Sequence, residues 1–260
     1  MNVLLTVQYD GTNYNGWQRQ ENTPHTIQQA LETALFERLG THHVITAAGR
    51  TDAGVHALAM PCAFRCDSLN IPPERLPLAL NSLLPPDIRV TGAAVVRDGF
   101  DPITDAVAKT YRYQINNSEI PNVFTRRYAW HVHTPLDIAA MAQAAEHFVG
   151  VHDFKAFAAV GGSAKTSIRE IFTLEVLREA DMISIYVTGN GFLYNMVRII
   201  TGTLVDVGLG RKRPSEIPDI LASCDRTNAG QTAPACGLAM LSVDYGENLT
   251  TGMLNLGGNT

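Results

Sequence analysis

The chain has 260 residues, of which 45% are hydrophobic and 17% are charged. This balance excludes an intrinsically disordered protein, and the length allows one large domain or two small ones with a sizeable core. The net charge is −5 and the isoelectric point is near 5.9, so the surface as a whole is not the basic one typical of nucleic-acid-binding proteins.

Two stretches nevertheless carry a local excess of positive charge. Between residues 104 and 133 the bases outnumber the acids: they are Lys109, Arg112, Arg126 and Arg127 against Asp105 and Glu119. Between residues 198 and 213 four bases face Asp206 alone. Such stretches could form a basic groove on an otherwise acidic protein, or simply be solvated loops.

The cysteine spacing bears on metal binding, and the apolar stretches and the N-terminal residues bear on the cellular compartment. Neither Cys62 and Cys66 nor Cys224 and Cys236 have the two-residue gap usual in structural zinc sites, so we expect free thiols and no metal. The apolar stretches are too short for a membrane span, and residues 1–5 enter a strand-like run with no basic segment before it. We therefore expect a cytoplasmic protein.

The first hundred residues predict strands at 3–9, 43–48, 56–66 and 88–97. Helices are predicted from 27 to about 39, between the N-cap Thr26 and the stop Gly40, and from 72 to about 84 between two Pro-Pro pairs. A polar loop at 10–20 contains Tyr14 and Trp17, which either stack on nucleotides or, more in keeping with a loop of this kind, close it over the core. This order favours an α+β fold with a mainly antiparallel sheet.

The loop at 49–55 contains a carboxylate, Asp52, between two glycines, Gly49 and Gly54. Because glycine permits positive φ and close backbone approach, we expect a tight, shaped loop that directs this carboxylate. The alternative is an ordinary Asx-turn between strands, since Asp and Gly are common turn residues.

The rest of the chain predicts strands at 106–115, 166–177, 182–188 and 238–245, and helices at 135–149, after the glycine turn 189–191, and after Pro214. In the first of these strands Lys109, Tyr111 and Tyr113 share one face. We expect an N-terminal α/β subdomain at 1–103, a C-terminal one at 104–245, and a short flexible tail at 246–260.

Six segments are similar to motifs of one family and follow one another in its order: residues 9–20 (YDG…Y.GWQ.Q), 49–57 (GRTDAGVHA), 109–113 (KTYRY), 152–157 (HDFKAF), 189–198 (GNGFLYNMVR) and 232–238 (TAPACGL). They resemble the TruA family of tRNA pseudouridine synthases, from about residue 3 to about residue 245. Where family proteins usually carry basic or polar residues, residues 158–162 read AAVGG.

The resemblance implies the pseudouridine synthase fold, in which two similar α/β subdomains share a long, mainly antiparallel sheet with the active-site cleft between them. It implies a homodimer that binds tRNA and isomerises uridine on the 3′ side of the anticodon stem-loop, without a cofactor or a metal. By this resemblance Asp52 is the catalytic carboxylate, Tyr111 stacks on the target base, and Arg198 pairs with Asp52. Further substrate contacts fall on Arg50, Arg169 and Asn195.

Two other functions compete with this one. A catalytically silent RNA-binding protein could use the same sheet, although the intact set of Asp52, Tyr111 and Arg198 argues against it. A two-carboxylate glycosidase would need a second carboxylate near Asp52, which the sequence does not identify. Release of free uracil would favour the glycosidase.

Overall fold

The computed structural model describes residues 1–246 and divides the chain into two compact units. The first unit comprises Met1–Val107 and Leu241–Thr260, and the second comprises Ala108–Met240. Apart from Gly246, the expected flexible tail lies outside the described residues. Each unit is considered by itself below.

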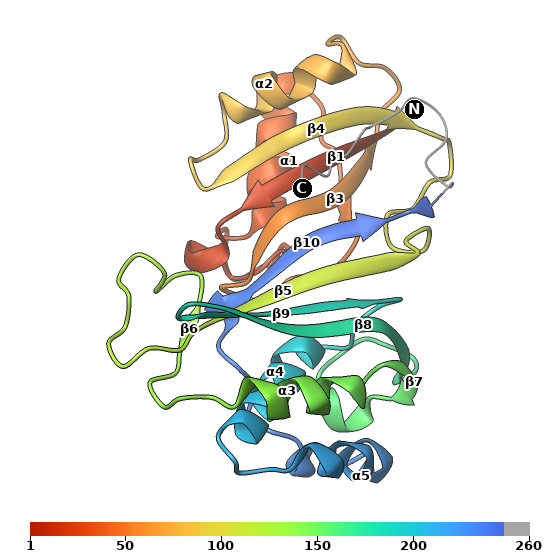
Figure 1. Ribbon diagram of the computed structural model, residues 1–260. Coiled ribbons are helices and arrows are strands. Elements are labelled where there is room, and N and C mark those ends of the chain that lie inside the picture. The colour runs from red at the N-terminus through yellow and green to blue at the C-terminus, as the bar shows by residue number, and fades with distance from the viewer. Residues whose placement is uncertain (247–260) are drawn as a thin grey trace. The chain divides into compact units, whose positions relative to one another are not determined.

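The first unit is built on antiparallel strands (Figure 1). The central strand β1 (Asn2–Tyr9) pairs on one side with β3 (His56–Arg65) and on the other with β4 (Ile88–Val96). A two-residue strand, β2 (Thr46–Ala47), pairs with β3. All of β1 except Gln8 is buried, so side chains on both of its faces belong to the core.

Two helices complete this unit. α1 (Ile27–Leu39) lies on one face of these strands, and α2 (Leu76–Asn81) packs beside it and against β4 (Figure 1). The Thr26 side chain accepts a hydrogen bond from the Gln29 N–H, and Gly40 ends the helix at φ +77°, as predicted from the sequence. Two 3₁₀ turns occur, Gly11–Asn13 and Pro73–Arg75.

The strand predicted at 43–48 was too long. The Ile45 N–H donates to the Glu32 carboxylate at 3.1 Å, and the Gln28 side chain donates to the Ile45 carbonyl at 3.1 Å. Because side chains of α1 bind this backbone, only Thr46 and Ala47 pair with a neighbouring strand. The helix predicted at 72–84 is likewise shorter, a 3₁₀ turn followed by α2.

The second unit has antiparallel strands in the order β5, β9, β8, β7, and a short β6 pairs with β5 in parallel. Their bounds are β5 (Ala108–Asn116), β6 (Trp130–His131), β7 (Gly150–Asp153), β8 (Ile168–Glu179) and β9 (Met182–Gly189). Alternate residues of β5, namely Tyr111, Tyr113 and Ile115, are buried, which confirms the predicted face.

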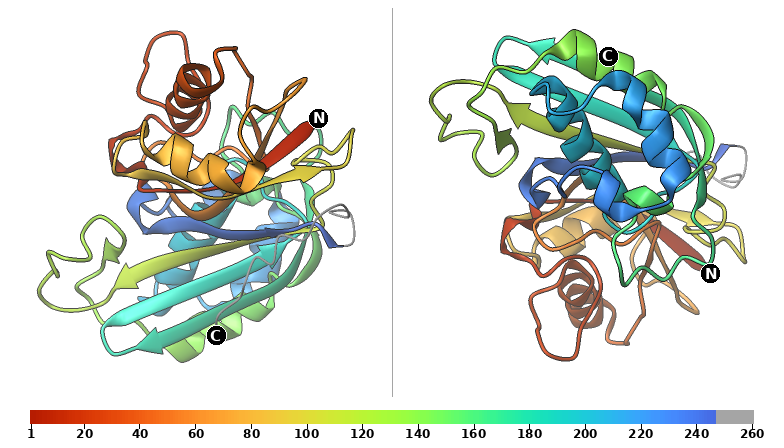
Figure 2. Two further views of the ribbon diagram at one scale, coloured as in Figure 1. Left: turned by 90° about the horizontal axis from the view of Figure 1, so that it is seen from above. Right: turned by 90° about the horizontal axis from the view of Figure 1, so that it is seen from below.

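The helices of this unit are α3 (Ile138–Glu146), α4 (Met196–Gly208) and α5 (Ile217–Ser223). α3 and α4 lie on one face of the sheet (Figure 1; Figure 2). Further 3₁₀ turns are Lys155–Phe157, Pro214–Glu216, Arg226–Asn228 and Ala235–Gly237. β10 (Leu238–Asp244) carries the chain from the second unit back to the first.

Some boundaries in this unit differ from the predicted ones. α3 begins three residues after Pro135 because Asp137 is its N-cap and accepts from the Ala140 N–H at 3.0 Å. The strands β6 and β7 were not predicted, since two and four residues give no readable alternation.

The described residues form a mixed α+β fold with a mainly antiparallel sheet, which confirms the predicted fold class. The arrangement of the two subdomains around one cleft stays a prediction. No helix in the described part of the chain has both the length and the apolar character that crossing a membrane requires.

Thr26 tests the origin of α1. We expect Thr26→Ala to lower the free energy of unfolding by about 1 kcal/mol, because the N-terminal amides of the helix lose their side-chain acceptor. Urea denaturation measures this change. Thr33→Ala, at an exposed position of the same helix, is the matched control and should leave stability unchanged or slightly raised. Equal losses in the two variants would contradict the capping role.

Candidate active site

Asp52 lies half-buried in the loop that joins β2 to β3. The loop turns at Ala53 and Gly54, where Gly54 has φ +79°, and the Val55 N–H donates to the Asp52 carbonyl at 3.1 Å. The Gly54 N–H donates to the Tyr14 carbonyl at 3.4 Å. Backbone oxygens therefore take both amides that an Asx-turn would give to the carboxylate, which argues against the simple turn.

The segment 14–17 holds this loop from outside. The Trp17 N–H donates to the Thr51 carbonyl at 3.0 Å, next to the Tyr14–Gly54 contact. Gly16 between them has φ +86°, and a Cβ added there would lie 2.6 Å from the Thr51 oxygen. Only glycine allows this close approach of two backbones, so Gly16 is a requirement of the Asp52 loop.

Side chains reinforce the same contact. The Tyr9 hydroxyl lies 2.7 Å from Thr51 Oγ1, and both residues are buried. Trp17 is 1% exposed and packs at a tilt against Tyr9, with ring centroids 6.0 Å apart. Trp17 is therefore the aromatic residue that closes the loop over the core, one of the two roles considered for it.

Tyr14 has a structural partner as well. Its hydroxyl donates to Asp87 Oδ1 at 2.6 Å. Burial, and then the hydrogen bond to Asp87, raise the pKa of Tyr14 well above its usual range. Tyr14 thus remains a neutral donor and ties its loop to the start of β4.

A histidine joins the segments 9–17 and 49–57. The buried His56 ring accepts at Nδ1 from the Gly11 N–H at 3.0 Å. An Asp10 carboxylate oxygen lies 3.2 Å from the same Nδ1.

In the second unit hydrogen bonds to Ala233 and Asn195 orient Arg198. Its Nε donates to the Ala233 carbonyl at 2.7 Å, and its Nη1 donates to Asn195 Oδ1 at 2.8 Å. The Ala233 N–H donates back to the Arg198 carbonyl at 3.1 Å. These contacts hold a permanent positive charge in one orientation at the first turn of α4.

The surroundings of α4 explain why Arg198 is held so firmly. Eleven of the 13 residues of this helix are buried. A Cβ at Gly202 would overlap the Gln231 carbonyl, and the Gly230 N–H donates to Thr203 Oγ1 at 2.8 Å. The segment that supplies the Ala233 carbonyl therefore packs directly on the helix that carries Arg198.

Asn195 orients Arg198 and does not cap its own helix. Its backbone is left-handed, at φ +60° and ψ +8°, and its side chain makes no capping hydrogen bond. The same side chain accepts from Arg198. Left-handed geometry is tolerated better by asparagine than by most residues, which suits it to this position.

Tyr111 is 8% exposed and meets the edge of an aromatic ring. Its ring and that of Phe192 are 5.2 Å apart at 86°. Its partner across the strands is Val187. Tyr113 donates to the Pro234 carbonyl at 2.7 Å, and burial raises the pKa of its phenol.

The other residues predicted to contact the substrate are Arg50 and Arg169. Arg50 is exposed, two residues before Asp52. Arg169 Nη1 donates to the Ile168 carbonyl at 2.6 Å and to the Thr166 carbonyl at 3.0 Å, and burial lowers the pKa of its guanidinium. His152 and Asp153 bind neighbouring backbone, the Val149 carbonyl and the Lys155 N–H, which fits a structural role.

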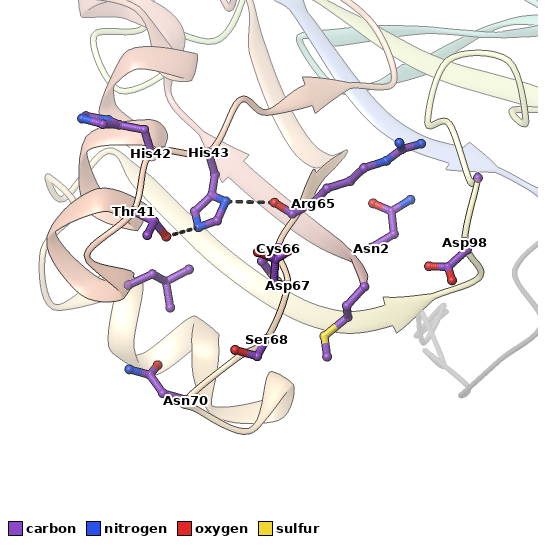
Figure 3. A pocket seen from close by; sticks show the side chains of 13 residues that line it. Asn2, Thr41, His42, His43, Arg65, Cys66, Asp67, Ser68, Asn70 and Asp98 are labelled. Atoms are coloured by element: carbon purple, nitrogen blue, oxygen red, sulfur yellow. Dashed lines mark hydrogen bonds between the residues drawn. The ribbon is translucent and has the colours of Figure 1, made fainter.

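A hollow of about 890 Å³ lies elsewhere in the first unit (Figure 3). It is lined by 13 residues, none from the loop 49–57. Both nitrogens of His43 in its wall are engaged, Nδ1 with the Arg65 carbonyl at 2.9 Å and Nε2 with Thr41 Oγ1 at 2.8 Å. Among residues 1–246 no three His, Cys, Asp or Glu side chains are grouped to hold a metal ion.

The first unit thus carries Asp52 and Arg50, and the second carries Tyr111, Arg169, Asn195 and Arg198. Sequence reasoning missed the supporting residues: Tyr9, Gly16, Thr51, His56, Phe192 and Ala233. Each lies inside one of the six motif segments, so the motifs themselves were the signal that could have found them.

Comparison with known proteins agrees with this assembly of motifs. The sequence model of a family described as tRNA pseudouridine synthase matches residues 5–101 and 144–246. A tRNA pseudouridine synthase A of Ruminiclostridium cellulolyticum is 47% identical over 244 residues, which cover 94% of this chain and 99% of that protein. The proteins of the same name from Caldicellulosiruptor saccharolyticus and Pelobacter propionicus are 45% and 47% identical, with the same coverage.

A solved structure, of a Cbf5-Nop10-Gar1 complex, aligns over 92% of this chain and 48% of that chain, with a TM-score of 0.39 and 12% identity. A likeness of that size carries no argument about this chain. The family match, which spans residues of both units, and the near full-length identity to these relatives do: the chain belongs to the tRNA pseudouridine synthase family, whose members isomerise uridine to pseudouridine.

Proposed function

We propose that the chain converts uridine to pseudouridine on the 3′ side of the anticodon stem-loop of tRNA, with Asp52 as the catalytic carboxylate. The observation that carries this proposal is the Asp52 loop. Its backbone is bound through Thr51 and Gly54, while the amides that follow Asp52 bind backbone oxygens. A carboxylate on a backbone that a neighbouring segment holds in place is suited to act on a substrate.

The reaction needs little besides this carboxylate. The bond between C1′ and N1 breaks, the uracil rotates, and a bond forms between C1′ and C5. C5 then loses its proton and N1 gains one, so atoms balance with no net redox change and no cofactor. Asp52 either attacks C1′ or takes a proton from the sugar, and both routes fit a positioned carboxylate.

Arg198 is proposed as the counter-ion of Asp52. An arginine stays charged under all ordinary conditions, and a positive neighbour favours the ionised form of a half-buried carboxylate. The contacts to Ala233 and Asn195 support this role because they leave the guanidinium little freedom to rotate.

Tyr111 is proposed as the platform for the detached uracil. Phe192 meets it edge to face and limits how its ring can turn. Extruding a base costs a few kcal/mol, and stacking of about 1–3 kcal/mol per base offsets much of that cost. Arg50, exposed beside the loop, would occupy the place that the uridine leaves, and Arg169 would contact the RNA backbone.

We further propose that two copies of the chain bind one tRNA as a homodimer, and that the protein acts in the cytoplasm. The homodimer rests on the resemblance to the family, and the cytoplasmic location is the expectation drawn from the sequence. The tRNA substrate has firmer support, because all three relatives described above are named tRNA pseudouridine synthase A.

Asp52→Asn tests the central role. We expect it to abolish tritium release from C5-tritiated uridine in unmodified tRNA while tRNA binding is retained, because the amide cannot attack the sugar or accept its proton. Asp67→Asn, at an exposed aspartate of the same unit, is the matched control and should react as wild type. Equal release by both variants would remove Asp52 from the reaction.

Gly16→Ala tests whether the outer segment positions Asp52. Its matched control is Gly40→Ala, since Gly40 also has positive φ but a Cβ there meets nothing within 4 Å. Both variants should lose about 1–2 kcal/mol of unfolding free energy from backbone strain alone. We expect Gly16→Ala, measured below its unfolding temperature, also to lose most of its kcat. Comparable turnover in the two variants would show that this contact does not matter.

Asn195→Gly tests the orientation of Arg198. Glycine keeps the left-handed backbone but removes the acceptor for Nη1, so we expect the fold to survive and kcat to fall about ten-fold, a barrier change of ~1.4 kcal/mol. Thermal unfolding and single-turnover rates measure the two quantities. An unchanged rate in a stable variant would mean that the Asn195 contact is not needed to orient Arg198.

A further inference from the structure

The segment between β5 and β6, residues 117–129, exposes more apolar surface than its neighbours; we call it the arm. Ile120 is 78% exposed, Val123 is 67% exposed and Phe124 is 88% exposed. In the views of Figure 1 and Figure 2 the segment extends away from the strands and helices of the second unit. Three large apolar side chains left this open within five residues of one another indicate a surface that binds something.

The arm is an ordered structure. At its base the His131 ring nitrogen Nε2 bonds the Ser118 carbonyl at 2.8 Å, and β6 pairs with β5. Further out, Asn122 Oδ1 accepts from the Phe124 N–H at 2.9 Å, and the Tyr128 N–H donates to the Thr125 carbonyl at 2.8 Å. The Phe124 ring is therefore presented from a turn that its own hydrogen bonds define.

The charged residues of the arm indicate what kind of partner it binds. The exposed arginines Arg126 and Arg127 follow Phe124 closely, and Glu119 is the acid of the segment, in a chain whose net charge is −5. Aromatic rings beside arginines are the combination that holds unpaired nucleotides, because a base stacks on the ring while a guanidinium binds the phosphate.

We propose that the arm binds an unpaired stretch of the tRNA, with Phe124 stacking on a base and Arg126 contacting a phosphate. This inference rests on the proposed function, since it adds a second contact to the same substrate. The arm would contribute to affinity and to the choice of tRNA, and not to the isomerisation itself.

Substitutions at Phe124 separate stacking from simple apolar contact. We expect Phe124→Leu to raise the Kd for unmodified tRNA about ten-fold, the size of effect expected for one lost stacked base, while Phe124→Tyr stays within about two-fold of wild type. Leu78→Ala, at a 77% exposed apolar position of the first unit, is the matched control and should bind as wild type. Filter binding at one fixed salt concentration gives these values.

Substitutions at Arg126 test the phosphate contact. Arg126→Ala should make the plot of log Kd against log salt concentration less steep by about one unit, and Arg126→Lys should restore the slope, because either cation releases a counter-ion on binding. Loss of affinity without a change of slope would contradict a phosphate contact.

Three further results separate the arm from its rivals. If Phe124→Leu left the Kd unchanged but lowered the molar mass by light scattering, the arm would be a protein interface and the proposal would fail. If wild type isomerised tRNA while Phe124→Leu kept its Kd and KM, the arm would fail and the proposed function would stand. If wild type bound tRNA without tritium release while Phe124→Leu bound more weakly, the proposed function would fail and the arm would stand.

Discussion

The backbone contact between the segment 14–17 and the loop 49–55 is the constraint on which the candidate site depends. Two chain segments approach so closely at Gly16 that a single methyl group would collide with Thr51. The hydrogen bonds on either side, to Thr51 and from Gly54, use backbone groups that are present in any sequence. What this chain adds is a glycine that permits the approach, and Tyr9 and Trp17, which seal it.

In the second unit a different set of contacts orients the Arg198 side chain. A long, flexible arginine must present its charge in one direction, and the protein achieves this by burying α4 and packing the segment 229–233 upon it. Ala233 and Asn195 then bind the guanidinium from the backbone and from a left-handed residue. In both units neighbouring backbone helps to position the candidate side chain, and backbone is less mobile than long polar side chains.

Much of this was predictable from the sequence, and the failures have physical causes. Thr26 and Gly40 set the limits of α1 through local hydrogen bonds, so they could be read directly. The absence of strand pairing at Ile45 could not be read in this way, because the side chains of Glu32 and Gln28 in α1 bind its backbone. The motifs gave Asp52 and Arg198 as candidate site residues, but not the supporting contacts of Tyr9, His56 and Ala233, since those contacts join residues that lie far apart in the chain.

The measurement that tests the central claim most directly is the product balance of wild-type protein on unmodified tRNA labelled with tritium at C5 of uridine. Released tritium, pseudouridine in the recovered tRNA and free uracil are measured in the same reaction. If the site isomerises uridine, tritium and pseudouridine appear in equal amounts and no free uracil is released, because the detached base is held until the new bond forms. Free uracil in place of pseudouridine would show that the site cleaves the glycosidic bond without rebuilding it, and would contradict the account.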